Sequence, residues 1–147
     1  MFTDLITRLD RIEAELALHR LAHHYCVAAD QRDLSLWRRV WTADAVWETD
    51  SDPDYVFTGI DAICAAVQRQ WQAFAVMQHG IVNHVVDVDR ATGRCDVIVH
   101  VRLADGSWVT GGGTYEDRYE RVDGQWRIGR RKVKGAFDLG PLPEWRR

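Results

Sequence analysis

Asp30 and His79 are the two residues whose types and positions could together do chemistry. Asp30 stands where a long amphipathic segment should end, and His79 begins the first long strand predicted after the helices, with Asn83 expected on the same strand face. A carboxylate that orients an imidazole across the mouth of a small cone supplies a base for removing a proton from carbon. A carboxylate is unfavourable at the negative end of a helix dipole, which favours a special role for Asp30.

Helices are predicted to precede the long strands, and the first of them ends near Asp30. Its apolar residues recur at helical spacing, and Thr3 is the expected N-cap. The predicted stripe consists of Leu5, Leu9, Ile12, Leu16, Ala22, Cys26 and Ala29. A second helix fits residues 34–40. Gly59 then separates two short strands, at 45–48 and 55–58, from a third helix at 61–75.

The rest of the chain is rich in strands. Long strands are predicted at residues 78–89, 95–103, 108–121 and 126–137, with the turn pairs Thr92-Gly93, Asp105-Gly106 and Asp123-Gly124 between them. Such pairs favour hairpins, so these strands should form an antiparallel meander. The triplet Gly111, Gly112 and Gly113 predicts a bulge or kink. Three helices beside a long curved sheet indicate an α+β cone with an interior pocket.

Length and composition narrow the class of protein. The 147 residues fit a single domain, 1–147, and 46% hydrophobic and 28% charged residues with a net charge of -3 describe a folded soluble chain. No basic stripe indicates a nucleic-acid partner. The acids spaced along the first helix do not fit a signal peptide or a membrane span, so we expect a cytoplasmic protein. Seven Trp residues favour an apolar small-molecule ligand.

Neither a metal nor an organic cofactor is predicted. Cys26, Cys64 and Cys95 are odd in number and widely spaced, which indicates reduced thiols. His19 and His23 stand four residues apart, but their segment lacks the glutamate of the zinc-protease motif. The glycine triplet is followed by neither Lys-Ser/Thr nor a helix, so it is not a phosphate loop.

Two segments and one short pattern resemble a known family. The pattern is His79 and, after three intervening residues, Asn83; the segments are YCVAADQRDLSLWRRVWTADAVWE and GGGTYEDRYERVDGQWRIGRRKV. They resemble the SnoaL-like branch of the nuclear-transport-factor-2-like superfamily over nearly the whole chain. The resemblance implies a cone-shaped, cystatin-like fold and a homo-oligomer, trimer or dimer, formed through the outer sheet face. Because this fold hosts many activities, the chemistry must be argued from the site.

Within that branch the chain is similar to hexachlorocyclohexane dehydrochlorinases, scytalone dehydratases and bile-acid 7α-dehydratases. That similarity implies a catalytic dyad of Asp30 and His79 and a pocket arginine at Arg131. Tyr25 falls where the dehydrochlorinases carry a lysine and the bile-acid dehydratases a tyrosine, so the leaving group stays open. His100 is the candidate for the second histidine of the scytalone dehydratases.

Strand alternation puts Arg131 and Val133 on the face opposite Arg130 and Lys132, so at least one of these cations should point inward if the sheet has a buried side. A buried arginine needs an anion, which either the substrate or a carboxylate would supply. Further candidates for substrate binding, each of which could instead simply pack in the core, are Trp47, Tyr55, Phe57, Trp71 and Tyr115.

The leading hypothesis is a cofactor-independent lyase acting on a hydrophobic cyclic substrate. His79 would be the general base, Asp30 would hold its tautomer, and Arg131 with Tyr25 would steady the leaving group or enolate. Two alternatives stay open: an isomerase or polyketide-cyclase-type enzyme with the same dyad, and a non-catalytic protein that binds a small ligand.

Overall fold

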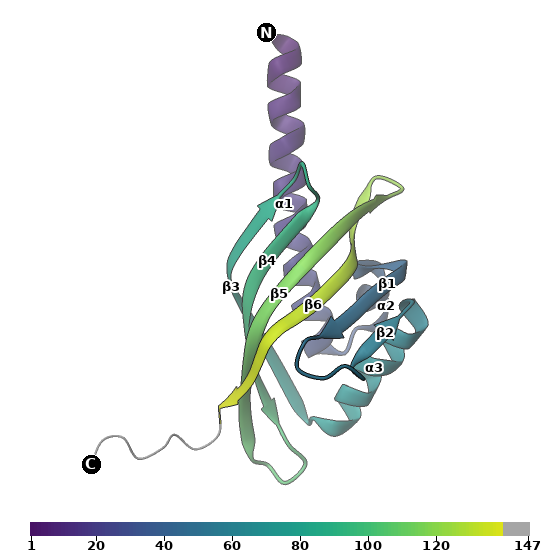
Figure 1. The fold of residues 1–147 in the computed structure, drawn as a ribbon, viewed down its shortest axis with the longest axis vertical. Coiled ribbons are helices and arrows are strands. Elements are labelled where there is room, and N and C mark those ends of the chain that lie inside the picture. The colour runs from purple at the N-terminus through teal and green to yellow at the C-terminus, as the bar shows by residue number, and fades with distance from the viewer. Residues whose placement is uncertain (140–147) are drawn as a thin grey trace, which may run out of the picture.

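The computed structural model describes residues 1–139, in which three helices pack beside a curved six-stranded sheet (Figure 1). The helices are α1 (Phe2–Gln31), α2 (Leu34–Val40) and α3 (Ile60–Ala73). The strands are β1 (Trp41–Thr49), β2 (Val56–Thr58), β3 (Val76–Asp87), β4 (Thr92–Arg102), β5 (Trp108–Val122) and β6 (Gln125–Leu139). Their order in the sheet is β2-β1-β6-β5-β4-β3. The predicted α+β fold is confirmed.

The boundaries of the first two helices follow from local backbone chemistry. Arg32 closes α1 in the left-handed conformation, with φ 56°, and Asp33 caps α2 by accepting the Leu36 N–H at 2.8 Å. The prediction of Thr3 as the N-cap of α1 is wrong, because the helix already begins at Phe2 and no side chain caps it. The local interactions that define where α1 ends therefore lie at its C-terminus, next to Asp30, and no side chain caps its N-terminus.

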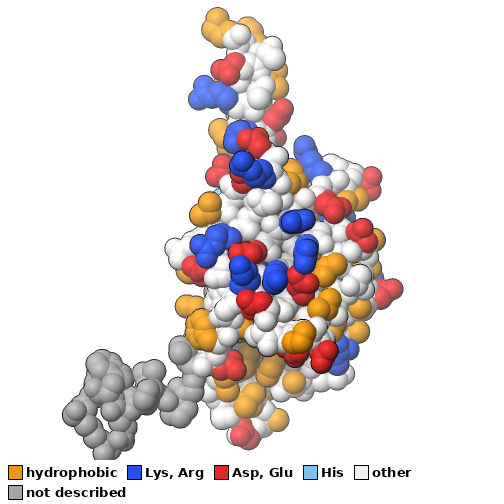
Figure 2. Space-filling model, in the orientation of Figure 1, with side chains coloured by type: hydrophobic (Ala, Val, Ile, Leu, Met, Phe, Trp, Pro, Cys, Tyr) orange, Lys and Arg blue, Asp and Glu red, His pale blue; other side chains and the backbone are white. Residues whose placement is uncertain are grey.

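The apolar residues of α1 form two faces instead of the single predicted stripe. Ala22 and Ala29 are buried against the sheet, whereas Leu5, Leu9, Ile12 and Leu16 are 50–57% exposed. Leu16 and Ala22 are six residues apart, which is roughly 240° around a helix, so the two sets point in different directions. Residues 1–16, which we call the N-terminal arm, extend past the sheet and expose hydrophobic side chains (Figures 1 and 2).

The strands from β3 to β6 form the predicted antiparallel meander. Asp123-Gly124 is a turn in which both residues have positive φ, as expected for its type, and Asp105-Gly106 also lies in a turn. The predicted turn at Thr92-Gly93 is wrong. Both residues belong to β4, and Ala91, with φ 51°, makes the left-handed bend before them. β1 adds a parallel contact to β6 that the sequence did not indicate.

The predicted irregularity at the glycine triplet is confirmed, since the β5–β6 register shifts between Gly112 and Thr114. A Cβ on Gly112 would lie 2.8 Å from the carbonyl oxygen of Val97, so the close approach of these strands requires glycine. The resulting curvature lets α1 and α3 cover one face of the sheet. The core between them is rich in aromatic residues, with Trp37 and Trp41 almost fully buried.

Candidate active site

Asp30 and His79 meet at the interface of α1 and β3. The Oδ1 atom of Asp30 lies 2.6 Å from Nδ1 of His79, and its Oδ2 accepts the backbone N–H of His79 at 2.8 Å. The side chains are only 14% and 7% exposed, respectively. Because one carboxylate bonds both the ring and the backbone of the same residue, it fixes the position of the imidazole as well as its rotation.

The hydrogen bonds of the dyad also assign the ring nitrogens. A carboxylate that accepts two N–H groups leaves Nδ1 as the donor, so in the neutral imidazole Nε2 is the acceptor. No hydrogen bond within residues 1–139 engages Nε2. The arrangement is that of a general base supported by a carboxylate.

His79 lines a cavity of about 420 Å³ between the helices and the sheet. Apolar side chains form much of its wall: Met77, Val97, Val99, Val101, Val109 and Val133. Its volume and apolar lining are typical of a site for a small molecule.

Four of the predicted aromatic residues, Tyr25, Trp47, Tyr55 and Tyr115, line this cavity. Phe57 and Trp71 do not. The Phe57 ring packs against Tyr55, with centroids 4.7 Å apart, and Trp71 donates its Nε1–H to the carbonyl of Ala29 at 2.7 Å. Phe57 and Trp71 therefore support the wall and helix α1 from behind.

The prediction that Asn83 shares a strand face with His79 is wrong. Asn83 has φ 55° and lies where the β3–β4 register shifts, so strand alternation is interrupted and its side chain bonds Asp96 at 2.9 Å on the exposed side. His84 takes the inward position instead. His100 is also outside the cavity, because its ring bonds Thr110 at 2.8 Å among exposed side chains.

Of the cations in this part of β6, Arg131 is the one that points inward, and it is fully buried. A carboxylate supplies its anion: Asp117, directly opposite on β5, accepts from Nε and Nη2 at 2.8 and 2.7 Å. The guanidinium also lies 4.1 Å from the ring centroids of both Tyr25 and Tyr115. Arg131 is absent from the cavity lining, so the two tyrosines separate it from the space beside His79.

The tyrosines of the cavity are hydrogen-bond donors at neutral pH. Burial raises the pKa of Tyr25 well above its ordinary value, and burial raises the pKa of Tyr55 to about 12. Tyr55 also accepts a hydrogen bond from Gln70 Nε2 at 2.9 Å, which fixes its hydroxyl within the cavity.

Several polar residues of the cavity were missed from the sequence: Thr49, Ser51, Asp52, Gln70 and Asp138. Asp52 lies in the loop between β1 and β2, whereas Asp138 comes from the far end of β6. No local pattern links these positions, because the sheet brings them together over long sequence distances. No lysine or arginine side chain lines this cavity within residues 1–139.

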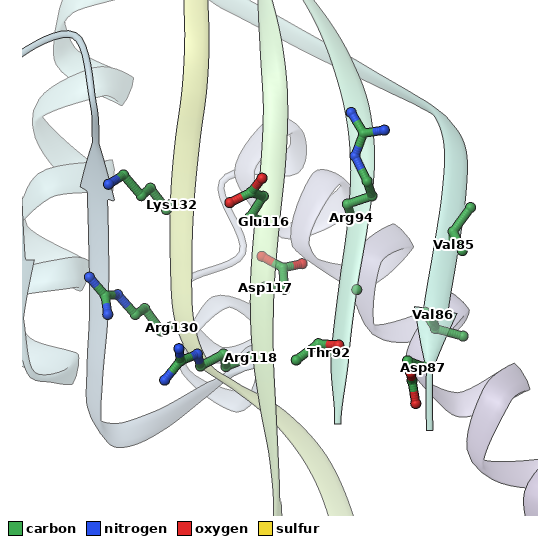
Figure 3. Close-up of a pocket in the computed structure, with 11 residues that line it drawn as sticks. Val85, Val86, Asp87, Thr92, Arg94, Glu116, Asp117, Arg118, Arg130 and Lys132 are labelled. Atoms are coloured by element: carbon green, nitrogen blue, oxygen red, sulfur yellow. The ribbon is translucent and has the colours of Figure 1, made fainter. Parts of the chain in front are cut away.

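A second concavity, of about 560 Å³, lies where Glu116 and Arg130 project from the sheet (Figure 3). Charges of both signs surround it, and Arg130 pairs with Glu48. Among its described residues there is no imidazole, thiol or phenol. The dyad cavity is therefore the better candidate for chemistry.

Within residues 1–139, no group of three or more His, Cys, Asp or Glu side chains has the geometry to hold a metal ion. No helix in this described part is both long and apolar enough to span a membrane. The three cysteines are buried free thiols, as predicted.

Three helices packed on a curved six-stranded sheet form the architecture of the nuclear-transport-factor-2-like superfamily. Residues 10–132 match the family model of the SnoaL-like domain, and the chain belongs to this family. Among curated proteins, none matches the chain.

Solved structures agree with this assignment. The chain is similar to the hexachlorocyclohexane dehydrochlorinase LinA, with 26% identity and a TM-score of 0.76 over 93% of this chain and 95% of LinA. A type 2 LinA gives 20% identity and a TM-score of 0.78 over 94% and 99% of the two chains. A scytalone dehydratase-like protein from Novosphingobium aromaticivorans is 22% identical to this chain, with a TM-score of 0.77 over 96% of this chain and 99% of that protein.

Proposed function

We propose that the protein is a cofactor-independent lyase of the dehydratase or dehydrohalogenase type, which begins its reaction by removing a proton from carbon. The observation that carries this proposal is the 2.6 Å contact between Asp30 and His79 at the wall of an apolar cavity. Nε2 of His79 takes the proton, and the Asp30 carboxylate stabilises the imidazolium that forms. The names of the similar solved structures, a dehydrochlorinase and a dehydratase-like protein, agree with this reaction class.

The tyrosines assist where negative charge develops. Tyr25 and Tyr115 line the cavity and carry phenol protons that can bond an enolate or a departing oxygen. Arg131 acts from behind them as a positioning residue, because its charge lies 4.1 Å from both rings while Asp117 holds it in place.

The charges of the cavity favour a neutral hydrophobic substrate. Two carboxylates, those of Asp52 and Asp138, line it, and no lining cation is present within residues 1–139 to offset them. An anionic substrate would be repelled by these groups and would lose its hydration without gaining a partner.

Isomerisation is the second candidate, and the lack of a lining cation favours it. A departing halide or hydroxide would meet the neutral phenol groups of Tyr25 and Tyr115, whereas an isomerase returns the proton to another carbon and expels nothing. Both reactions share the first step at His79.

The test measures proton abstraction and product mass separately. Purified protein is incubated in D₂O with neutral cyclic compounds that carry a hydroxyl or halide β to an acidic C–H. We expect deuterium exchange at that carbon, and loss of water or hydrogen halide if the protein is a lyase. An isomerase gives a product that keeps every heavy atom of the substrate and gains mass only through the deuterium it takes up.

The matched variants are His79→Ala and His100→Ala. His79→Ala should remove exchange and turnover, by a factor of about 10² to 10⁴, with the fold intact. His100→Ala makes the same change at a histidine outside the cavity and should keep both. Wild-type exchange in the His79→Ala variant would refute the proposed base.

A further inference from the structure

The N-terminal arm has no packing partner of its own size within the described chain. Residues 1–13 are all exposed, and the first buried residue of α1 is Ala14. The side-chain ion pair that connects residues 1–13 to the remainder of the described chain joins Arg11 to Asp89 at 2.9 Å. A helix of this length is marginally stable in water when it stands alone, so a structure that covers its apolar side would stabilise it.

The exposed apolar residues of the arm follow a heptad pattern. Phe2, Leu5, Leu9, Ile12 and Leu16 are spaced by three and four residues in alternation, which places them at the a, d, a, d and a positions. All are 50–83% exposed. Such a seam is the contact surface of a coiled coil. The pattern ends at the next d position, where His19 instead bonds His84 of its own chain at 2.9 Å.

The seam points away from the protein's own domain. Successive residues turn by about 100° around a helix, so the seam lies roughly opposite Ala14, Leu18 and Ala22, which pack on the sheet. The same side of α1 stays exposed further along, at His23 and Val27. A second helix can therefore lie along the arm with its own domain on the far side, without steric conflict.

The charges beside the seam select the partner and its direction. Arg8 and Glu15 occupy g positions, and Glu13 and Arg20 occupy the e positions five residues later. In a parallel pair each g residue faces the following e residue of the other helix, which gives Arg8–Glu13 and Glu15–Arg20 contacts between chains. In each of these contacts the two side chains carry opposite charges, and the twofold symmetry of the pair makes each contact occur twice. An antiparallel pair would match fewer of these charges.

We infer that the N-terminal arm forms a parallel coiled coil with the arm of a second copy of this chain. Five seam residues at half exposure or more bury roughly 500 Å² per helix, or about 1,000 Å² in total, which reaches the lower bound of specific interfaces. The contact is self-complementary about a twofold axis, as a homodimer requires. This surface is separate from the outer face of the sheet and from the dyad cavity.

Crosslinking of the full chain tests the contact directly. The native cysteines are buried, so Leu5→Cys adds a single reactive thiol at a d position. A short bis-maleimide should join two copies of Leu5→Cys in high yield. Thr7→Cys, exposed at the f position opposite the seam, is the control and should stay unlinked. Equal yields from the two variants would overturn the inference.

Sedimentation equilibrium supplies the second measurement. Leu9→Glu should lower the mass by half with unchanged circular dichroism, whereas Thr7→Glu should leave the mass unchanged. Arg8→Glu should weaken association about tenfold, since two pairs become repulsive, and Arg8→Glu with Glu13→Arg should restore it. A monomeric wild type, a mass insensitive to Leu9→Glu, or a double variant that stays weak would each refute the parallel coiled coil.

Discussion

Asp117→Asn should be among the most damaging single substitutions in this chain. The Asp117 and Arg131 side chains are 0% and 1% exposed, and the guanidinium is clamped by two hydrogen bonds and two tyrosine rings. The amide keeps the shape of the carboxylate but removes its charge, which leaves a buried cation unpaired. Removing one partner of such a pair lowers the free energy of unfolding by about 4 kcal/mol. For a domain of this size, that loss lowers the melting temperature by roughly 12 °C.

The measurement is urea unfolding followed by tryptophan fluorescence and circular dichroism. Glu116→Gln is the matched control on the same strand, since Glu116 pairs with Lys134 at 3.3 Å with both side chains about half exposed. Glu116→Gln should lower the free energy of unfolding by less than about 0.5 kcal/mol. Asp117→Leu with Arg131→Met removes both charges and should recover at least half of the loss. If Asp117→Asn were no worse than Glu116→Gln, the structural assignment of this pair would be wrong.

Three further expectations follow from the site and its surroundings. Asp30→Asn should keep the fold by circular dichroism and lower turnover by about 10² to 10⁴, because the imidazole loses its charge support. Burial, aided by His19, lowers the pKa of His84 to about 4. Between pH 7 and pH 4 the folded state therefore binds fewer protons than the unfolded state, and the free energy of unfolding should fall by about 2 kcal/mol over this range. In the His84→Gln variant the free energy of unfolding should fall less over the same range. Gly112→Ala should destabilise by about 2 kcal/mol in urea titrations, since its methyl meets the Val97 carbonyl.

The dyad could be predicted because its geometry depends on two element boundaries that leave clear signals. α1 ends at a left-handed residue just before a capped helix, and β3 begins soon after α3 ends. These boundaries place Asp30 and His79 at adjoining ends of packed elements. The resemblance to the SnoaL-like branch then pairs them, which spacing alone could not do.

Asn83 shows where pattern reasoning fails. Strand alternation has a period of two, so one extra residue in β3 moves every later side chain to the other face. The register shift between Val82 and Val85 does this, and it brings His84 inward in place of Asn83. The residues from Val82 to Val85, where the register shifts, include no glycine or proline that would announce the bulge. The left-handed conformation that asparagine tolerates is visible only in the structure.

An inward cation on β6 could be predicted from strand alternation, and the resemblance indicated Arg131, but the partner of Arg131 could not be predicted. Asp117 is one of three adjacent charged residues on β5, and only the β5–β6 register places it, and neither Glu116 nor Arg118, opposite Arg131 on the inner face. The parallel pairing of β1 with β6 escaped prediction for a similar reason. Contacts between distant segments leave no local signal in the chain.

The position of α1 connects the catalytic proposal with the inference about self-association. One continuous helix carries the exposed seam at its start and both Tyr25 and Asp30 near its end. Between them Leu18, Ala22 and Ala28 are almost fully buried, so the sheet holds the middle of the helix. A rigidly held helix does not transmit a change of partner along its axis unless its packing shifts. Leu9→Glu should therefore separate the two copies while leaving turnover by the Asp30–His79 dyad unchanged. If the variant lost turnover together with self-association, the arm would also position the dyad.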